Sequence, residues 1–322
     1  MNTTWLSVIV PTYNGAAYLA DALESLLSQI DDQTEVLVVD DGSTDDTVTI
    51  LNTYSNRMPL RIIRRKHLGN WVANSNYALS SALGRFVCFL HQDDLWLPER
   101  LSILKRVTTS VPNAALYVHP VRYLDALGED VGPWNCPLPA GTLSPRVVIE
   151  RLLVQNFIAM PAPLFPREKA LEVGGLNESL WYTADWDFWL KLAAMGPTVY
   201  VPRALAAFRI HGNSQTAQWV SRAEEMRRQI EFVLNQHLPR WEATSPTFRS
   251  VRAVARLAVE INFALAALAH GQRPTARVLA ERLLMLDWDD CYRLLRDSRI
   301  LERVLARVRA YWVPALLPLK QA

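Results

Sequence analysis

The sequence predicts an α/β fold with a mostly parallel sheet flanked by helices, followed by an all-helical C-terminal extension. Short apolar, β-branched runs alternate with helical segments over the first ninety or so residues, which is the pattern of parallel βαβ units. Polar residues follow several of these runs directly. From about residue 217, long segments rich in Ala, Leu and Arg replace the strand pattern. We therefore predict two domains, residues 1–215 and residues 216–322.

The predicted strands and helices of the first domain follow in order. Strands are expected over residues 6–10, 34–40, 60–65 and 85–90. Helices are expected between them, over residues 16–30, 45–55 and 70–83. The first helix places Leu19, Leu23, Leu26 and Leu27 at helical spacing, with Asn14 near its start. Consecutive parallel strands joined by such helices require right-handed crossovers.

The rest of the first domain is less regular. Residues 111–166 are rich in Pro and Trp and show no clear period. Residues 166–175 read as a helix that ends at Gly174 or Gly175. A second helix is expected over residues 184–196 and a short strand over residues 198–202. We expect residues 207–216, "AFRIHGNSQT", to lead out of the domain.

The sequence of the C-terminal extension predicts helices and no strands. Residues 248–271 and 274–286 indicate an antiparallel helical pair. In the last helix, the spacing predicts one stripe of arginines, Arg296, Arg299, Arg303 and Arg307. An apolar segment, "YWVPALLPLK", follows this helix.

Composition narrows the class of protein. The chain has 322 residues, of which half are hydrophobic and a fifth charged, as in ordinary globular proteins. A net charge of +2 gives no reason to expect nucleic acid as a partner, although residues 216–322 carry 17 basic and 11 acidic residues. Three cysteines without CxxC spacing argue against a disulfide framework or a zinc site. Without a signal peptide or a long apolar run, we expect a cytoplasmic protein.

Three polar motifs follow predicted parallel strands: "PTYN" at residues 11–14, "DDGSTDD" at residues 40–46 and "HQDD" at residues 91–94. Ligands of such sheets bind at the carboxyl ends of the strands. No GxGxxG or Walker A sequence is present, which argues against a dinucleotide enzyme and a P-loop NTPase. A strand-end cap explains one of Asp93 and Asp94, whereas a cation held against an anionic ligand explains both.

These motifs, together with "ADWDFWLKLA" and "FRIHGNS", occur in an order that resembles the family-two inverting glycosyltransferases with the GT-A fold. The resemblance covers roughly residues 5–215. It implies a Rossmann-like GT-A domain that binds a nucleotide-sugar. Pro11, Tyr13 and Asp41 would hold the nucleotide base. Asp93, with His211, would bind a divalent cation, Mn²⁺ or Mg²⁺, on the donor diphosphate.

The chain departs from the family pattern at three positions. His91 stands at the first motif position, where Asp is common, and we leave it open as a cation ligand or a polar strand-end residue. Ser75 precedes Asn76 where relatives often carry Arg. Ala184 replaces the acid that precedes the catalytic Asp.

Inverting transfer requires a base that takes the proton of the acceptor hydroxyl. The resemblance assigns this role to Asp185, with helix capping as the alternative and Asp187 as the second choice. Trp181 is the candidate for stacking on the acceptor sugar, although clustered tryptophans such as Trp186 and Trp189 are often core residues.

The predicted function is metal-dependent, inverting transfer of a hexosyl group to a hydroxyl acceptor. The resemblance suggests synthesis of a bacterial surface polysaccharide, such as an O-antigen or an exopolysaccharide. A catalytically inactive nucleotide-sugar-binding or scaffolding module is the alternative, since two motif acids are replaced. Lipid-linked acceptors are common in glycan assembly, so we also predict peripheral contact of the C-terminal helices with the inner face of the cytoplasmic membrane. The alternative for these helices is packing on the catalytic domain.

Overall fold

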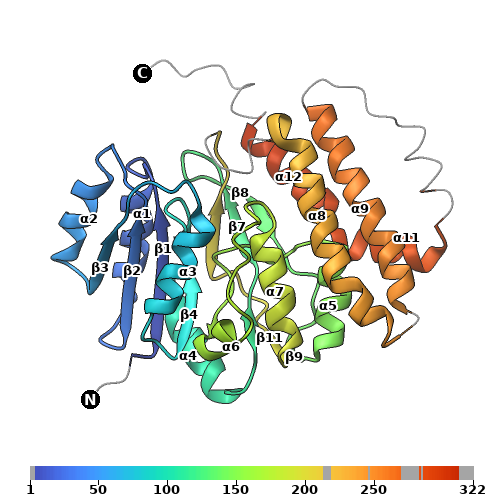
Figure 1. Cartoon of the computed structure of the whole chain (residues 1–322), viewed down its shortest axis with the longest axis horizontal. Coiled ribbons are helices and arrows are strands. Elements are labelled where there is room, and N and C mark those ends of the chain that lie inside the picture. The colour runs from blue at the N-terminus through green and yellow to red at the C-terminus, as the bar shows by residue number, and fades with distance from the viewer. Residues whose placement is uncertain (1–3, 213–218, 246, 270–282, 284–285, 312–322) are drawn as a thin grey trace.

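The computed structural model describes residues 4–212, 219–245, 247–269, 283 and 286–311. Its N-terminal half is an α/β sandwich, and its C-terminal helices stand beside it (Figure 1). The predicted α/β class, with a mostly parallel sheet and helices after the core domain, is therefore confirmed.

Five strands form the main sheet in the order β10-β4-β1-β2-β3. They are β1 (Leu6–Thr12), β2 (Thr34–Asp40), β3 (Leu60–Arg64), β4 (Phe86–Phe89) and β10 (Phe165–Pro166). The first four are parallel and β10 is antiparallel. Because the chain runs outward from β1 to β3 and then returns to β4 on the other side of β1, the strand order reverses between β1 and β4. Such a reversal opens a crevice at the carboxyl ends of the two strands.

Both faces of this sheet are buried, which explains the continuous apolar runs of its strands. In β1, Leu6, Val8 and Val10 pack into one core cluster, and Ile9 packs into another on the opposite face. Leu19, Leu23 and Leu26 of α1 cover the first face, so the predicted stripe of this helix is its buried side. The flanking helices are α1 (Leu19–Leu27), α2 (Thr47–Ser55), α3 (Trp71–Ser81) and α4 (Arg100–Ser110).

The segment without a clear period contains a helix and contributes strands to two small sheets, whose other strands come from before and after it. One sheet joins β6 (Leu116–Val118), β11 (Thr198–Tyr200) and β9 (Gly141–Leu143). The other joins β5 (Leu95–Trp96), β12 (Ala206–Arg209), β7 (Val121–Leu124) and β8 (Asp130–Trp134). Residues 207–209 of the segment expected to lead out of the domain belong to β12, which pairs with β5 and β7, and residues 213–216 lie outside the described residues. These strands have two to five residues, too few to show a period.

The helices that follow the main sheet carry the rest of the site and its support. They are α5 (Pro145–Val154), α6 (Arg167–Glu172), α7 (Ala184–Ala194), α8 (Trp219–Glu242), α9 (Thr247–Ala269), α11 (Trp288–Ser298) and α12 (Ile300–Tyr311). The α9 helix confirms the first member of the predicted pair, and α8 lies alongside it (Figure 1). Most of the second member, residues 274–286, lies outside the described residues.

The predictions of a single last helix and of an arginine stripe along it were wrong. Arg299 adopts the left-handed conformation, with φ of 49°, and separates α11 from α12. The two arginines at this break are engaged locally, Arg296 with Asp297 and Arg299 with Glu302. The side chains of Arg303 and Arg307, and the apolar segment beyond residue 311, lie outside what the structure describes.

One hydrophobic core connects the α/β half of the molecule with the C-terminal helices. It contains Phe188 and Trp189 of α7, Val233 of α8, Phe248 of α9 and Leu294 of α11. The boundary predicted at residues 215 and 216 falls in a segment that the structure does not describe, and it stays a prediction. Among the described helices, none has the length and apolarity that crossing a bilayer requires.

Candidate functional site

Gln92 lies between the loop that follows β1 and the loop that follows β4. Its Oε1 accepts hydrogen bonds from the Thr12 hydroxyl at 2.5 Å and the Tyr13 amide at 2.9 Å, and its Nε2 donates to the Tyr13 carbonyl. A side chain at Gly15 would collide with Gln92, since a Cβ there would lie 2.5 Å from Oε1. Gln92 therefore ties the loop after β1 to the loop after β4, and it brings the "PTYN" and "HQDD" motifs together.

Asp41 stands at the next strand end and organises the loop before α3. Its two carboxylate oxygens accept the amides of Leu68 and Gly69 at 2.9 and 2.8 Å. His67 of the same loop contacts Asp41 and stacks on Tyr13, with ring centroids 4.2 Å apart. Tyr13 is 41% exposed, whereas Pro11 is buried within β1. The three residues predicted to hold a base thus lie along one edge, with the Tyr13 ring open to the crevice.

The pair of adjacent carboxylates divides between the crevice and the interior. Asp94 is buried, and its Oδ1 accepts the Arg209 amide of β12. Burial, reinforced by the Asp93 charge, raises the pKa of Asp94 well above its ordinary value. Asp93 is partly exposed, and its Oδ2 lies 2.8 Å from Nε2 of His211. The strand β12, which ends two residues earlier, therefore brings His211 to Asp93, the other residue to which the resemblance assigns the cation.

The donor atoms at this point fit a divalent cation. One nitrogen of His91 and one oxygen each of Asp93 and Asp94 lie within 4.8 Å of one another. Nε2 of His91, Oδ2 of Asp94 and Nδ1 of His211 are buried without a hydrogen-bond partner among the described residues. Two ligand atoms at right angles around an ion, each about 2.1 Å away, lie about 3 Å apart, which matches the contact between His211 and Asp93.

Asp185 lies in the first turn of α7, next to Ala184, which is fully buried. Its Oδ2 accepts a hydrogen bond from Nδ2 of Asn156 at 2.9 Å, and its Oδ1 accepts the Trp186 amide. Burial raises the pKa of Asp185 to about 6, against these two hydrogen bonds, which lower it. A carboxylate with such a pKa can take a proton near neutral pH.

Asp187 serves a different purpose two residues later. It is 1% exposed and lies between Nζ of Lys191 at 2.7 Å and Nε2 of His237 at 2.8 Å. Burial alone would raise the pKa of Asp187, but the hydrogen bonds from His237 and Lys191 lower it. Because His237 belongs to α8, this cluster fastens α7 to the C-terminal helices. Because its pKa is lowered whereas that of Asp185 is raised, Asp187 is the weaker base of the two.

Comparison with known proteins agrees with this geometry. Residues 7–144 match the family described as Glycosyl transferase family 2. Residues 7–144 of the chain therefore form a glycosyltransferase family 2 region. An uncharacterized glycosyltransferase of Haemophilus influenzae is 32% identical over 188 residues, which cover 58% of this chain and 61% of that protein. The chain thus spans less than two thirds of this relative. An uncharacterized protein of Mycobacterium tuberculosis is 29% identical over 78% of this chain and 80% of its own length.

Two solved structures share the fold. Crystal structures of S. aureus TarS residues 1–349 include a complex with UDP-GlcNAc, which aligns at a TM-score of 0.58 and 18% identity over 95% of this chain and 91% of that one. The mannosyltransferase PcManGT from Pyrobaculum calidifontis, in complex with GDP-Man and Mn²⁺, aligns at 0.56 and 22% identity over 95% and 87%. At these identities the likeness establishes the GT-A fold of this family member and not its substrate.

Trp181 is held by the C-terminal helices. The Arg222 guanidinium lies 3.8 Å from its ring centroid, and its indole N–H donates to Glu225 at 2.6 Å. The peptide carbonyl of Trp181 accepts the indole N–H of Trp71, whose ring packs edge-on against His91. Trp71 therefore connects the loop of Trp181 with the motif after β4. Trp186 and Trp189 are core residues, 4% and 0% exposed.

Three residues of the site were not singled out from the sequence: Gln92, Asn156 and Trp71. Gln92 lies inside a recognised motif, so its position was a usable signal. Asn156 follows α5 in the segment without a clear period and acts 29 positions away in the chain. Trp71 lies in the first turn of a helix, where its contacts with the loop 110 positions later leave no local pattern.

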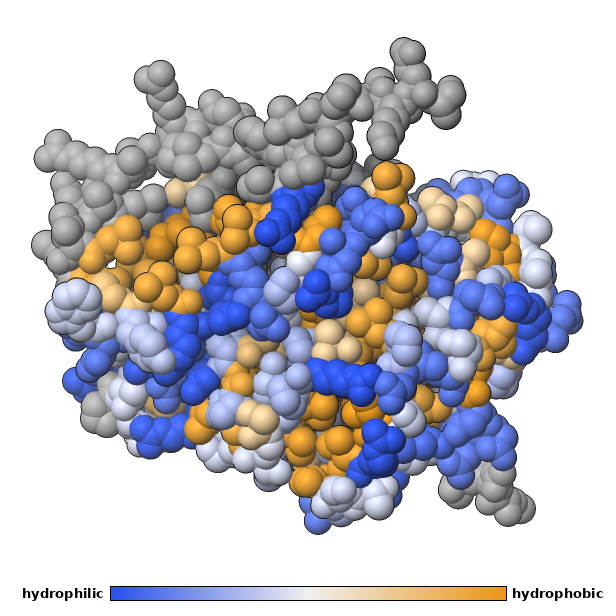
Figure 2. Space-filling view, turned by 180° about the vertical axis from the view of Figure 1, so that it is seen from behind, coloured by the Kyte–Doolittle hydropathy of each residue, from blue (hydrophilic) through white to orange (hydrophobic). Residues whose placement is uncertain are grey.

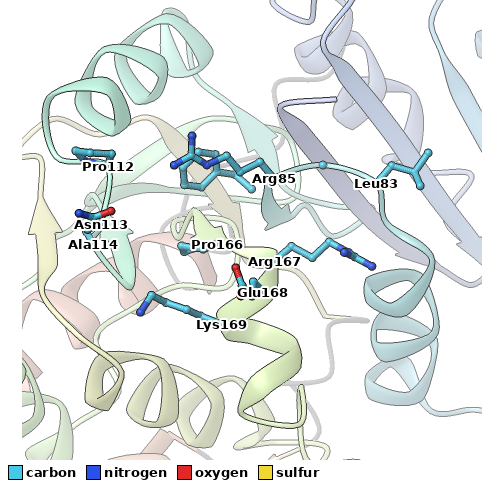
Figure 3. Close-up of a pocket in the computed structure, with 11 residues that line it drawn as sticks. Leu83, Arg85, Pro112, Asn113, Ala114, Pro166, Arg167, Glu168 and Lys169 are labelled. Carbon is cyan, nitrogen blue, oxygen red and sulfur yellow. The ribbon is translucent and has the colours of Figure 1, made fainter. Parts of the chain in front are cut away.

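A cavity of about 530 Å³ lies elsewhere (Figure 3). Its lining includes Gly84, Arg85 and Phe86, at the amino end of β4, together with Arg167 and Lys169 of α6. Asp93 follows the carboxyl end of the same strand, so this cavity opens at the opposite edge of the sheet from the crevice. It is not the donor site.

Proposed function

We propose that this protein transfers a sugar from a nucleotide-sugar donor to a hydroxyl acceptor, with inversion at the anomeric carbon and with a divalent cation as cofactor. The observation that carries the proposal is the meeting of Asp41, Asp93 and the Tyr13 loop at the carboxyl edge of the sheet, joined by Gln92. The complexes of TarS with UDP-GlcNAc and of PcManGT with GDP-Man and Mn²⁺ support it as relatives of the same fold.

The donor half of the site consists of Pro11, Tyr13, Asp41 and Asp93. Pro11 and Tyr13 flank the nucleotide base, and Asp41 accepts a hydrogen bond from it with oxygens that the loop amides already orient. Asp93 and His211 hold the cation, Mn²⁺ or Mg²⁺. When bound, the cation neutralises the negative charge that develops on the departing nucleotide diphosphate.

The acceptor half consists of Asp185 and the surface around it. As the acceptor oxygen attacks the anomeric carbon, the bond to the diphosphate breaks and Asp185 takes the hydroxyl proton. Asn156 keeps the carboxylate in one orientation through the bond to Oδ2. Trp181 offers the ring face that Arg222 does not cover to the acceptor sugar.

We propose that the donor carries a hexosyl group and that the acceptor belongs to a bacterial surface polysaccharide, an O-antigen or an exopolysaccharide. The protein would work at the cytoplasmic side of the membrane. The alternative is a module that binds nucleotide-sugars without turnover, favoured by the replacement of motif acids by His91 and Ala184.

The test is a screen of UDP- and GDP-sugars with the full chain, with and without Mn²⁺. We expect at least one donor to raise the melting temperature only with Mn²⁺, since ligands that bind the folded state stabilise it. The same donor should be hydrolysed slowly, or consumed faster with an acceptor glycan. Stabilisation without any turnover would favour the inactive module, and no stabilisation by any donor would refute the proposed function.

We also propose that the C-terminal helices contact the anionic surface of the membrane, where a lipid-linked acceptor would lie. The broken arginine stripe no longer supports this contact. Instead, Trp288, Tyr292 and Leu295 recur at intervals of four and three along α11 and are 91%, 64% and 59% exposed. Figure 2 shows hydrophobic residues gathered on the side where the C-terminal helices lie. Exposed Trp and Tyr on one helix face are typical of helices that lie in a membrane interface.

Vesicle sedimentation tests this contact. The variant with Trp288→Ser and Tyr292→Ser should bind vesicles of anionic phospholipid several-fold less than the native chain. The matched control is Leu83→Ser, because Leu83 is 68% exposed at the end of α3, far from these helices in the sequence. Equal binding by all three proteins would leave packing as the role of the helices.

A further inference from the structure

His91 occupies the first position of the cation-binding motif and carries a feature that a strand-end residue does not need. Its Nε2 is buried and has no hydrogen-bond partner in the part of the chain that the structure describes. A buried polar atom without a partner is costly unless a ligand completes its bonding. The ring itself is fixed, because Trp71 packs against it edge-on, with ring centroids 5.1 Å apart and planes at 71°.

The surroundings of His91 supply the other donor atoms of a cation site. Asp93 and Asp94 each place a carboxylate oxygen within 4.8 Å of an imidazole nitrogen of His91. Asp94 is 1% exposed and its Oδ2 has no partner among the residues described. These three residues therefore offer one nitrogen and two oxygens, and an aspartate at position 91 would replace that nitrogen by an oxygen.

This difference matters for the choice of cation. Mg²⁺ and Ca²⁺ are hard ions that prefer oxygen ligands. Carboxylates offset the cost of removing the water that such ions hold. Imidazole suits transition-metal ions, and the affinity of a mixed nitrogen and oxygen site rises from Mn²⁺ to Co²⁺. Exchanging a carboxylate for an imidazole also removes one negative charge, which weakens binding of hard ions most.

We propose that His91 is a ligand of the donor cation and that it makes the site select transition-metal ions, Mn²⁺ and Co²⁺, over Mg²⁺. The inference rests on the proposed function for the presence of a donor cation. It adds that the identity of residue 91 sets which cation is used. Trp71 is a positioning residue in this scheme, because it holds the ring of His91 and contacts the loop of Trp181.

Metal binding tests the inference without requiring transfer. The full chain is titrated with Mn²⁺ and with Mg²⁺, alone and with UDP or GDP, by calorimetry. His91→Asp should lower the ratio of Mn²⁺ affinity to Mg²⁺ affinity at least tenfold, and His91→Ala should weaken Mn²⁺ binding while affecting Mg²⁺ little. The matched control is His67→Ala, which removes an imidazole that stacks on Tyr13 nearby and should leave the ratio within twofold.

Pulsed electron paramagnetic resonance gives a second readout on the native chain. Bound Mn²⁺ should show hyperfine coupling to histidine nitrogen, and the coupling should weaken in His91→Ala and in His91→Asp alike. Mn²⁺ bound with an unchanged nitrogen coupling in both variants, or an unchanged affinity ratio in His91→Asp, would overturn the inference and leave the proposed function standing. A native chain that binds neither cation, with or without nucleotide, would overturn both.

Discussion

Asp93 and Asp94 are neighbours in the chain, yet the fold gives them different surroundings. Asp94 is buried, and the Arg209 amide of β12 donates a hydrogen bond to its Oδ1. The strand β12 thereby holds this side of the motif. Asp93 is partly exposed at the crevice and contacts His211. The side chain that faces the donor is therefore the one whose charge the reaction can use.

Replacing Asp93 by Asn should abolish most transfer. The loss of one charged ligand should cost several kcal/mol of leaving-group stabilisation, about a hundredfold or more in rate. It should also remove the metal dependence of nucleotide binding, measured by calorimetry with and without Mn²⁺. Asp45→Asn is the matched control, because Asp45 lies on the same edge but its oxygens serve Ala16 and Thr47. Near-native turnover of Asp93→Asn would contradict the cation assignment.

Asp185 and Asp187 can be separated by the kind of defect that each causes. Asp185→Asn should spare donor binding and reduce transfer by about 10²–10⁴-fold, the usual contribution of a general base. Rates at saturating donor and the donor affinity would be measured for both variants. Asp187→Asn should instead lower stability, since its carboxylate joins Lys191 and His237. Should Asp187→Asn fold normally and lose more activity, the assigned base would be the wrong one.

The pH dependence of transfer follows from the pKa of Asp185, about 6. A base acts only when deprotonated, so the rate should be nearly constant above pH 7 and fall about tenfold per unit below pH 5. The profile should bend near pH 6. A rate that stays constant down to pH 4.5, in a protein that remains folded, would show that no group with this pKa acts as the base.

At the scale of elements, the contact between α7 and α8 holds the acceptor side together. Asp187 of α7 lies between Lys191 of the same helix and His237 of α8, and all three are largely buried. Removing one member of a buried charged pair leaves its partners uncompensated, at a cost of about 3–5 kcal/mol. This contact positions the helix whose first turn carries Asp185.

Asp187→Asn should therefore lower the free energy of unfolding, measured by urea titration at pH 7. Arg227→Ala is the control, because the pair of Arg227 with Glu260 is more exposed and should contribute less than about 1 kcal/mol. The pKa of Asp187 is lowered in the folded state, so its contribution is present at neutral pH and is lost as the pH falls below its ordinary value of 3.8. The difference in stability between the two variants should therefore shrink steadily as the pH is lowered from 5 to 3. A difference that stays constant over this range would contradict an ionic origin.

At the scale of the whole molecule, the catalytic half and the C-terminal helices share a core, so we expect them to unfold together. Phe248 of α9 is fully buried in the cluster that also contains Trp189 of α7. Phe248→Ala should cost about 3–5 kcal/mol. The melting curves followed by tryptophan fluorescence and by far-ultraviolet circular dichroism should move down together in one transition. Two separate transitions, with only one of them shifted, would indicate that the helices fold independently.

The sequence by itself determined the parallel strands, their connecting helices and the three motifs at their carboxyl ends. Each of these depends on short-range order. Alternation and helical spacing are local properties of the chain, and a parallel βαβ connection fixes which end of a strand carries the following loop. The positions of Asp41, Asp93 and Asp185 in strand-end loops and a helix start followed from this order and from the resemblance to the family.

Only the tertiary structure decided how these pieces meet. Gln92 bonds a loop 79 positions away, β12 closes a sheet with strands of two to five residues, and His237 reaches Asp187 across 50 positions. The break at Arg299 is likewise a left-handed residue that helical spacing does not reveal. Such contacts depend on which surfaces the folded chain brings together, and periodicity in a single segment contains no information about them.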